Sequence, residues 1–86
     1  MRRKTDDSEY FLNLGRKLRK IRKNHGLSQK EVAAIIGVTF QQYQKYESGE
    51  NRIPANSLVI FCELTDSDIK ELTYYKAYSF QKSIKI

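Results

Sequence analysis

Two predicted helices separated by only three residues are the feature that most limits how this chain can fold. The first is predicted over residues 28–36, where a serine followed three residues later by a glutamate has the spacing of a capping box. The second is predicted over residues 40–47, with Thr39 as a favourable N-cap. Gly37 stands between them, and glycine tolerates the positive φ that a reversal within three residues requires. The two helices are therefore expected to form one compact unit.

Three further helices are predicted around this unit from apolar residues at three- and four-residue spacing. One begins near residue 9 and stops at Gly26, one has Pro54 in its first turn, and one follows the cap-like cluster at 65–68. Their apolar positions are, in turn, Phe11, Leu14, Leu18 and Ile21; Leu58, Phe61, Cys62 and Leu64; and Ile69, Leu72, Tyr75 and Tyr78. No strand is predicted. The fold class is therefore all-α, a compact bundle of five helices.

A chain of 86 residues has room for one domain. We expect residues 1–8 to form a flexible N-terminal arm, residues 9–79 to form the folded domain, and residues 80–86 to form a C-terminal tail. The sequence contains no apolar stretch long enough to span a membrane and no signal peptide at its N-terminus. We therefore expect a cytoplasmic protein without membrane contacts.

Several functional classes are disfavoured by residues that the sequence lacks. Cys62 is the single cysteine and His25 the single histidine, so neither an internal disulfide nor a metal site is expected. The sequence also shows no nucleophile–base pair, no paired carboxylates and no glycine-rich phosphate loop. We therefore expect no enzyme activity, no catalytic residues and no cofactor.

Positive charge is concentrated in the first part of the chain. The formal net charge of the chain is +6, and residues 1–25 alone hold nine basic and three acidic side chains. One face of the protein is therefore expected to attract polyanions, and nucleic acid is the first candidate. A solvated helix face that only keeps the protein soluble would produce the same pattern, so charge alone leaves both interpretations open.

Four short motifs are spaced along the middle of the chain: LSQKEVA at residues 27–33, IGVT at 36–39, YESG at 46–49 and RIP at 52–54. Together they resemble the Cro/phage-repressor helix-turn-helix family, also known as the xenobiotic-response-element family, over roughly residues 11–64. The resemblance implies a lambda-repressor-like bundle that regulates transcription by binding double-stranded DNA. The helix that begins near Thr39 would enter the major groove, and a homodimer would bind a two-fold operator.

The resemblance also implies roles for individual residues. Side chains of the second helix of the pair would contact base edges: Phe40, Gln41, Gln42, Gln44 and Lys45. Helix starts and the following loop would contact phosphates: Ser28, Gln29, Thr39, Asn51 and Arg52. Arg22 and Glu47 would form a structural ion pair between the first helix and the third. The chemistry agrees, because glutamine can bond adenine, lysine can bond guanine, and a phenyl ring can contact a thymine methyl.

Each of these assignments has a structural alternative. Phe40 fits either a base contact or a buried position under the turn. Tyr43 and Tyr46 lie three residues apart on one helix face and are expected in the core. The pair of Arg22 and Glu47 is expected to be partly buried, although a surface pair would contribute little to stability. Ile35 departs from the family pattern, which usually has a polar residue there, and is expected to be exposed.

The segment after Leu72 contains more apolar and aromatic side chains than a free tail normally shows. We expect it to form a homodimer contact, and the alternative is that it packs back on its own domain. A different function is also compatible with this segment. The chain could be an antitoxin or an interaction module that uses the segment to bind a protein partner.

Overall fold

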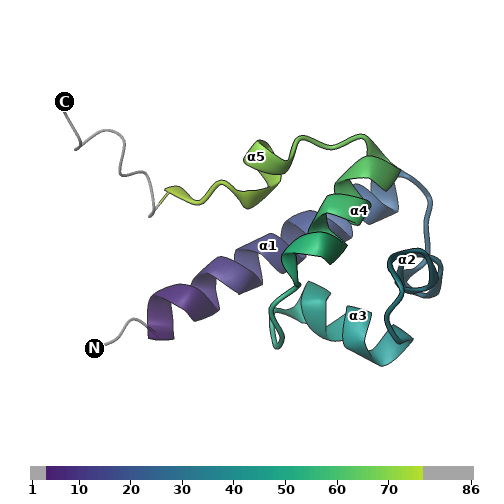
Figure 1. Cartoon of the computed structure of the whole chain (residues 1–86). Helices are drawn as coiled ribbons and strands as arrows, with labels where there is room; N and C mark the ends of the chain where they lie inside the picture. The colour runs from purple at the N-terminus through teal and green to yellow at the C-terminus, as the bar shows by residue number, and fades with distance from the viewer. Residues whose placement is uncertain (1–3, 77–86) are drawn as a thin grey trace.

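Five α-helices and no strand make up the part of the chain that the structure describes (Figure 1). This computed structural model describes the backbone of residues 4–76 and the side chains of residues 7–76. The helices are α1 (Lys4–Asn24), α2 (Gln29–Ile36), α3 (Phe40–Ser48), α4 (Ala55–Thr65) and α5 (Ile69–Thr73). The predicted all-α fold of five helices is confirmed.

Local hydrogen bonds define the starts of α2 and α3. The Ser28 hydroxyl accepts a bond from the Glu31 amide at 3.0 Å, and the Glu31 carboxylate accepts one from the Ser28 amide at 2.8 Å. The Thr39 hydroxyl accepts a bond from the Gln42 amide at 3.0 Å. Gly37 lies between the two helices with a φ of 83°, in the left-handed region. The sequence pattern therefore predicted the turn and both caps correctly.

The core lies where the first four helices meet. Each of these helices contributes one completely buried side chain, and the four are Leu18, Val32, Tyr43 and Phe61. Tyr46 is also buried, with its ring edge-on to Tyr43 at a centroid distance of 6.2 Å. In Figure 1, α2 and α3 lie on one side of α4 and α5 lies on the other. One face of α3 is therefore held by the core, which leaves its other face for a ligand.

A close backbone contact joins α1 to the end of α3 at Gly15. A Cβ atom added to Gly15 would lie 2.3 Å from the Glu47 carbonyl oxygen and 2.8 Å from the Tyr46 carbonyl oxygen. Glycine therefore lets the two helix backbones approach each other there. Gly49 ends α3 with a φ of 84°, and a Cβ atom added to it would lie 2.9 Å from the Cα atom of Leu12. These two glycines determine how deeply α3 sits against α1.

Three helix boundaries differ from the prediction, namely the starts of α1 and α4 and the end of α5. Helix α1 begins at Lys4, so residues 4–8 belong to a helix and not to the flexible arm predicted above. Acidic side chains near this end favour the helix, because they complement the positive end of its dipole. Helix α4 begins just after Pro54, which is its N-cap and not part of its first turn. Helix α5 ends at Thr73, so Tyr75 lies beyond it, while Tyr78 lies outside the described residues.

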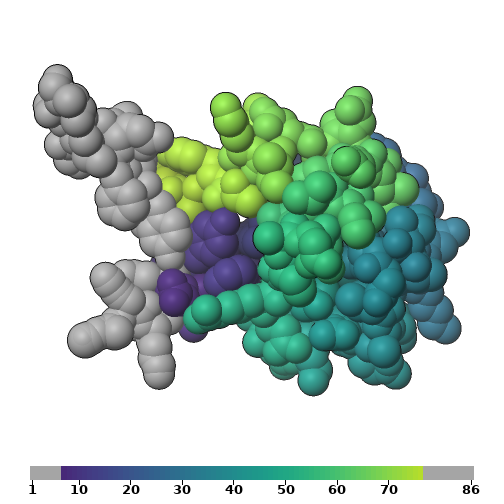
Figure 2. Space-filling model, in the orientation of Figure 1, coloured from purple at the N-terminus to yellow at the C-terminus, as the bar shows by residue number. Residues whose placement is uncertain are grey.

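The end of α5 is tied to α1. The Lys17 ammonium donates to the carbonyl oxygens of Glu71, Leu72 and Tyr74 at 3.4, 3.4 and 2.8 Å. The Tyr10 hydroxyl donates to the Thr73 carbonyl at 2.9 Å. Figure 2 shows this segment, in yellow, against the purple surface of α1. The backbone at the end of α5 is therefore held against α1, whereas the Tyr74 side chain is exposed.

Candidate nucleic-acid interface

Helix α3 has one buried face and one polar, exposed face. Tyr43, Tyr46 and Glu47 are buried on the core side. Four of the five predicted base-contact residues are exposed, and these are Gln41, Gln42, Gln44 and Lys45. An exposed row of amides and one ammonium provides hydrogen-bond donors and acceptors that fit base edges in a major groove. The geometry of α3 therefore suits the predicted role of this helix.

Phe40, the fifth predicted base-contact residue, is neither buried nor fully exposed. It is half-buried at the start of α3 and is not a member of the hydrophobic core. The Lys30 ammonium lies 5.4 Å from the centroid of its ring. Ile35 is exposed on α2, as the departure from the family pattern predicts.

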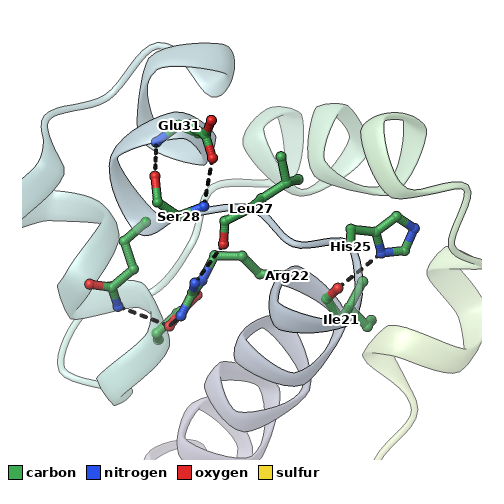
Figure 3. Close-up of polar contacts among 8 residues, drawn as sticks. Ile21, Arg22, His25, Leu27, Ser28 and Glu31 are labelled. Atoms are coloured by element: carbon green, nitrogen blue, oxygen red, sulfur yellow. Dashed lines mark hydrogen bonds and ion pairs between the residues drawn. The ribbon is translucent and has the colours of Figure 1, made fainter.

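A buried polar network connects the first three helices. Arg22 Nε lies 2.6 Å from Glu47 Oε2, and Arg22 Nη2 lies 3.1 Å from Glu47 Oε1. Arg22 Nη1 donates to the Leu27 carbonyl at 2.8 Å, and Figure 3 shows the guanidinium directed toward that carbonyl. Gln29 Nε2 donates to Glu47 Oε1 at 2.9 Å. Both charged side chains are buried, so the pair is structural and not a surface contact.

The network shifts the pKa values of its members. Burial opposes the charged form of Glu47, but the hydrogen bonds from Arg22 and Gln29 outweigh it and lower the pKa of this carboxyl below its ordinary value. The hydrogen bond to Glu47 raises the pKa of Arg22. Burial, followed by the nearby Glu47 carboxylate, raises the pKa of Tyr43, whose hydroxyl has no hydrogen-bond partner among the described residues. Glu47 is therefore ionised at neutral pH.

We expect the Glu47 contribution to stability to disappear in acid. A carboxyl whose pKa is lowered by folding stabilises the protein above the unfolded pKa and loses that effect as pH falls through the folded pKa. The free energy of unfolding of Glu47→Gln should therefore lie well below wild type at pH 7 and approach it as the pH falls through the lowered pKa of Glu47. Urea titrations at several pH values measure this difference. The same substitution at exposed Glu63 controls for the loss of one carboxylate, and a gap for Glu47→Gln that stays constant with pH would contradict the expectation.

A groove of about 450 Å³ brings predicted base and phosphate contacts together. Its lining comes from the three helices of the network and the turn after α3: Arg19, Gln29, Gln41, Gln44, Lys45, Glu47, Ser48 and Glu50. Gln29 uses Nε2 to bond Glu47, and its second amide hydrogen remains for a phosphate. Arg19, Ser48 and Glu50 were not assigned to the interface from the sequence, although all three line the groove. Arg19 could have been found, because it is one of the basic residues of α1 that fall outside its apolar positions, which are Phe11, Leu14, Leu18 and Ile21.

The other four predicted phosphate contacts do not line this groove. Ser28 and Thr39 are exposed, and their hydroxyls accept cap hydrogen bonds, which leaves the hydroxyl hydrogens to donate. Asn51 and Arg52 are exposed in the loop after α3. Arg52 lies away from the groove, where it bonds Asp7 at 3.3 Å and stacks over Phe11 at 5.3 Å. DNA that binds Arg52 would therefore have to compete with the Asp7 carboxylate.

No described helix combines the length and the apolar character needed to cross a bilayer. No three His, Cys, Asp or Glu side chains among residues 7–76 gather closely enough to hold a metal ion.

Comparison with known proteins agrees with this geometry. A family model described as helix-turn-helix matches residues 18–72. The uncharacterized HTH-type transcriptional regulator RC0668 of Rickettsia conorii is 43% identical over 56 residues, which cover 65% of this chain and 45% of that protein. Regulator y4aM of Sinorhizobium fredii is 49% identical over 45 residues, covering 52% of this chain and 32% of that protein. The chain thus spans less than half the length of these relatives.

Two solved structures share the fold. The restriction-modification controller protein C.AhdI from Aeromonas hydrophila superposes with a TM-score of 0.66 at 24% identity, over 72% of this chain and 94% of that chain. The clp gene regulator ClgR from Corynebacterium glutamicum superposes with a TM-score of 0.71 at 20% identity, over 86% of this chain and 79% of that chain. At these identities the likeness concerns the fold alone.

Proposed function

This chain belongs to the Cro/repressor-type helix-turn-helix family, and from that premise we propose that it is a sequence-specific regulator of transcription that binds double-stranded DNA. The observation that carries the proposal is α3, whose core face is anchored by Tyr43 and Tyr46 while its other face presents three exposed glutamines and Lys45. A rigid helix with such a face fits the major groove. The proposal involves no catalytic step.

In this proposal α3 contacts the bases and its surroundings contact the backbone. Gln41 is the candidate for a bidentate contact with adenine, and Lys45 is a candidate donor to guanine. Phosphates on one side would be held from the start of α2 by Ser28 and Gln29, and on the other side from the loop that carries Arg52. A regulator must meet its operator in the compartment that holds the DNA, so we also propose a cytoplasmic location.

Selection of bound duplexes from a random library tests the proposal and returns the operator. The selected duplex and a scrambled one are then compared by fluorescence anisotropy over a range of salt concentrations. Sequence-specific binding predicts a large excess of affinity for the selected duplex, typically by a factor of about 10³ or more. Equal affinity for the two duplexes would refute sequence-specific regulation.

Substitutions should separate base contacts from phosphate contacts. We expect Gln41→Ala to weaken binding to the operator about tenfold or more and to leave scrambled DNA almost unaffected, because it removes a base contact. Arg52→Ala should weaken both duplexes similarly and reduce the slope of log affinity against log salt by about 1. Anisotropy with both duplexes measures the two effects. The same pattern of loss in both variants would show that the division of roles is wrong.

We also propose that the chain binds DNA as a homodimer. One helix-turn-helix unit contacts only about four to five base pairs, so two units on a two-fold operator are needed for specificity. Tyr74 supports the proposal, because it is 56% exposed at the end of the described segment. Sedimentation analysis with and without a Tyr74→Ser substitution tests it, and a wild-type protein that stays monomeric at micromolar concentration and on its operator would contradict it.

A further inference from the structure

A lysine from α2 covers the aromatic ring at the start of α3. Lys30 is the second residue of α2, and Phe40 is the first residue of α3, directly after the Thr39 cap. The turn brings them together across ten positions of sequence, with the Lys30 ammonium 5.4 Å from the ring centroid. A cation at that distance from a phenyl ring is attracted by the ring's negative face.

The surroundings of the pair indicate that this contact orients the ring. Phe40 lies outside the hydrophobic core, so core packing does not fix it. Lys30 is exposed and forms no ion pair with a carboxylate among the described residues, so no salt bridge draws its ammonium away from the ring. A half-buried phenyl group held from one side by a cation still offers part of its surface to a ligand.

We propose that Lys30 is a positioning residue that holds the Phe40 ring for contact with the methyl group of a thymine. This inference rests on the DNA-binding function proposed above and adds a residue that sets base preference without touching the base. Phe40 lies at the first position of the helix proposed to enter the major groove, where the thymine methyl is accessible. An ordered ring contacts one methyl group, whereas a mobile ring distributes its contacts and loses the preference.

Three substitutions of lysine separate this role from a simple phosphate contact. Lys30→Met keeps most of the aliphatic stem and removes the charge, whereas Lys30→Arg keeps a cation over the ring. Lys70→Met, at an exposed position on α5, controls for the loss of one positive charge. The probe is the selected operator with each thymine replaced in turn by uracil, which removes only the methyl group.

At one thymine we expect wild-type protein to bind the methylated form about fourfold more tightly, the value of one buried methyl group. Phe40→Ala should abolish this preference, and Lys30→Met should reduce it to less than about twofold. Lys30→Arg and Lys70→Met should retain it. If Lys30→Met retains the full preference and only weakens all duplexes with a smaller salt slope, Lys30 contacts phosphate and the proposal is wrong.

A measurement without DNA keeps this test separate from that of the proposed function. The ring current of Phe40 should move the Lys30 ε-methylene resonances upfield in the free protein, and Phe40→Ala should abolish that shift. Unshifted resonances would overturn the proposal even if the protein proves to be a specific DNA binder. Wild-type protein that binds selected and scrambled duplexes equally would instead refute the proposed function, whatever the resonances show.

Discussion

A Gly15→Ala variant should be less stable than wild type by roughly 2–3 kcal/mol, the cost of overpacking a closely packed interface. The sign is informative, because glycine to alanine inside a helix normally stabilises a protein by about 1 kcal/mol. At Gly15 the added methyl would lie 2.3 Å from the Glu47 carbonyl oxygen, and a backbone atom in a helix cannot rotate away as a flexible side chain can. Urea denaturation followed by circular dichroism measures the change.

Gly26→Ala is the control for this substitution. A Cβ atom at Gly26 would meet nothing within 4 Å, but the residue has a φ of 69°. Its expected loss of about 1 kcal/mol therefore comes from backbone conformation alone. If Gly15→Ala proves as stable as wild type, α1 and α3 can separate without cost, and the close approach is not what positions α3.

Gly15 also illustrates the kind of contact that the sequence could not predict. The caps, the turn and the core tyrosines follow from residues close together in sequence, so their spacing predicted them. The periodicity of α1 marked its apolar positions but could not show that Gly15 touches a carbonyl of α3, because that contact joins distant segments. The end of α5 was missed for the same reason. The apolar pattern continues to Tyr75, whereas hydrogen bonds from Tyr10 and Lys17 of α1 hold the chain that leaves the helix.

The candidate site likewise combines features that the sequence predicted with contacts that only the structure shows. The exposed face of α3 could be predicted from the sequence, since a helix with two buried tyrosines leaves its polar residues outside. The pair of Arg22 and Glu47 and its partial burial were expected from the family resemblance, whereas its hydrogen bonds to Leu27 and Gln29 came only from the structure. The contacts of Lys30 with Phe40 and of Arg52 with Asp7 depend on how the helices pack, and no local pattern indicates them.

Removing one member of the buried ion pair should have the largest effect on stability. We expect Arg22→Met to lower the free energy of unfolding by about 3–5 kcal/mol, because it leaves the Glu47 carboxylate buried without its counterion. For a domain of this size such a loss approaches the total stability. Arg52→Met is the matched control, since its pair with Asp7 is exposed and should contribute less than about 1 kcal/mol.

The double variant Arg22→Met/Glu47→Leu distinguishes stability from DNA binding. Apolar residues of similar volume can replace a buried ion pair at little cost, so most of the lost stability should return. Operator affinity should not return with it, because the double variant lacks the carboxylate that orients Gln29 at the start of α2. Urea denaturation and anisotropy on the same preparations measure both quantities. If affinity recovers together with stability, the pair only fills space, and Gln29 does not depend on Glu47 to meet a phosphate.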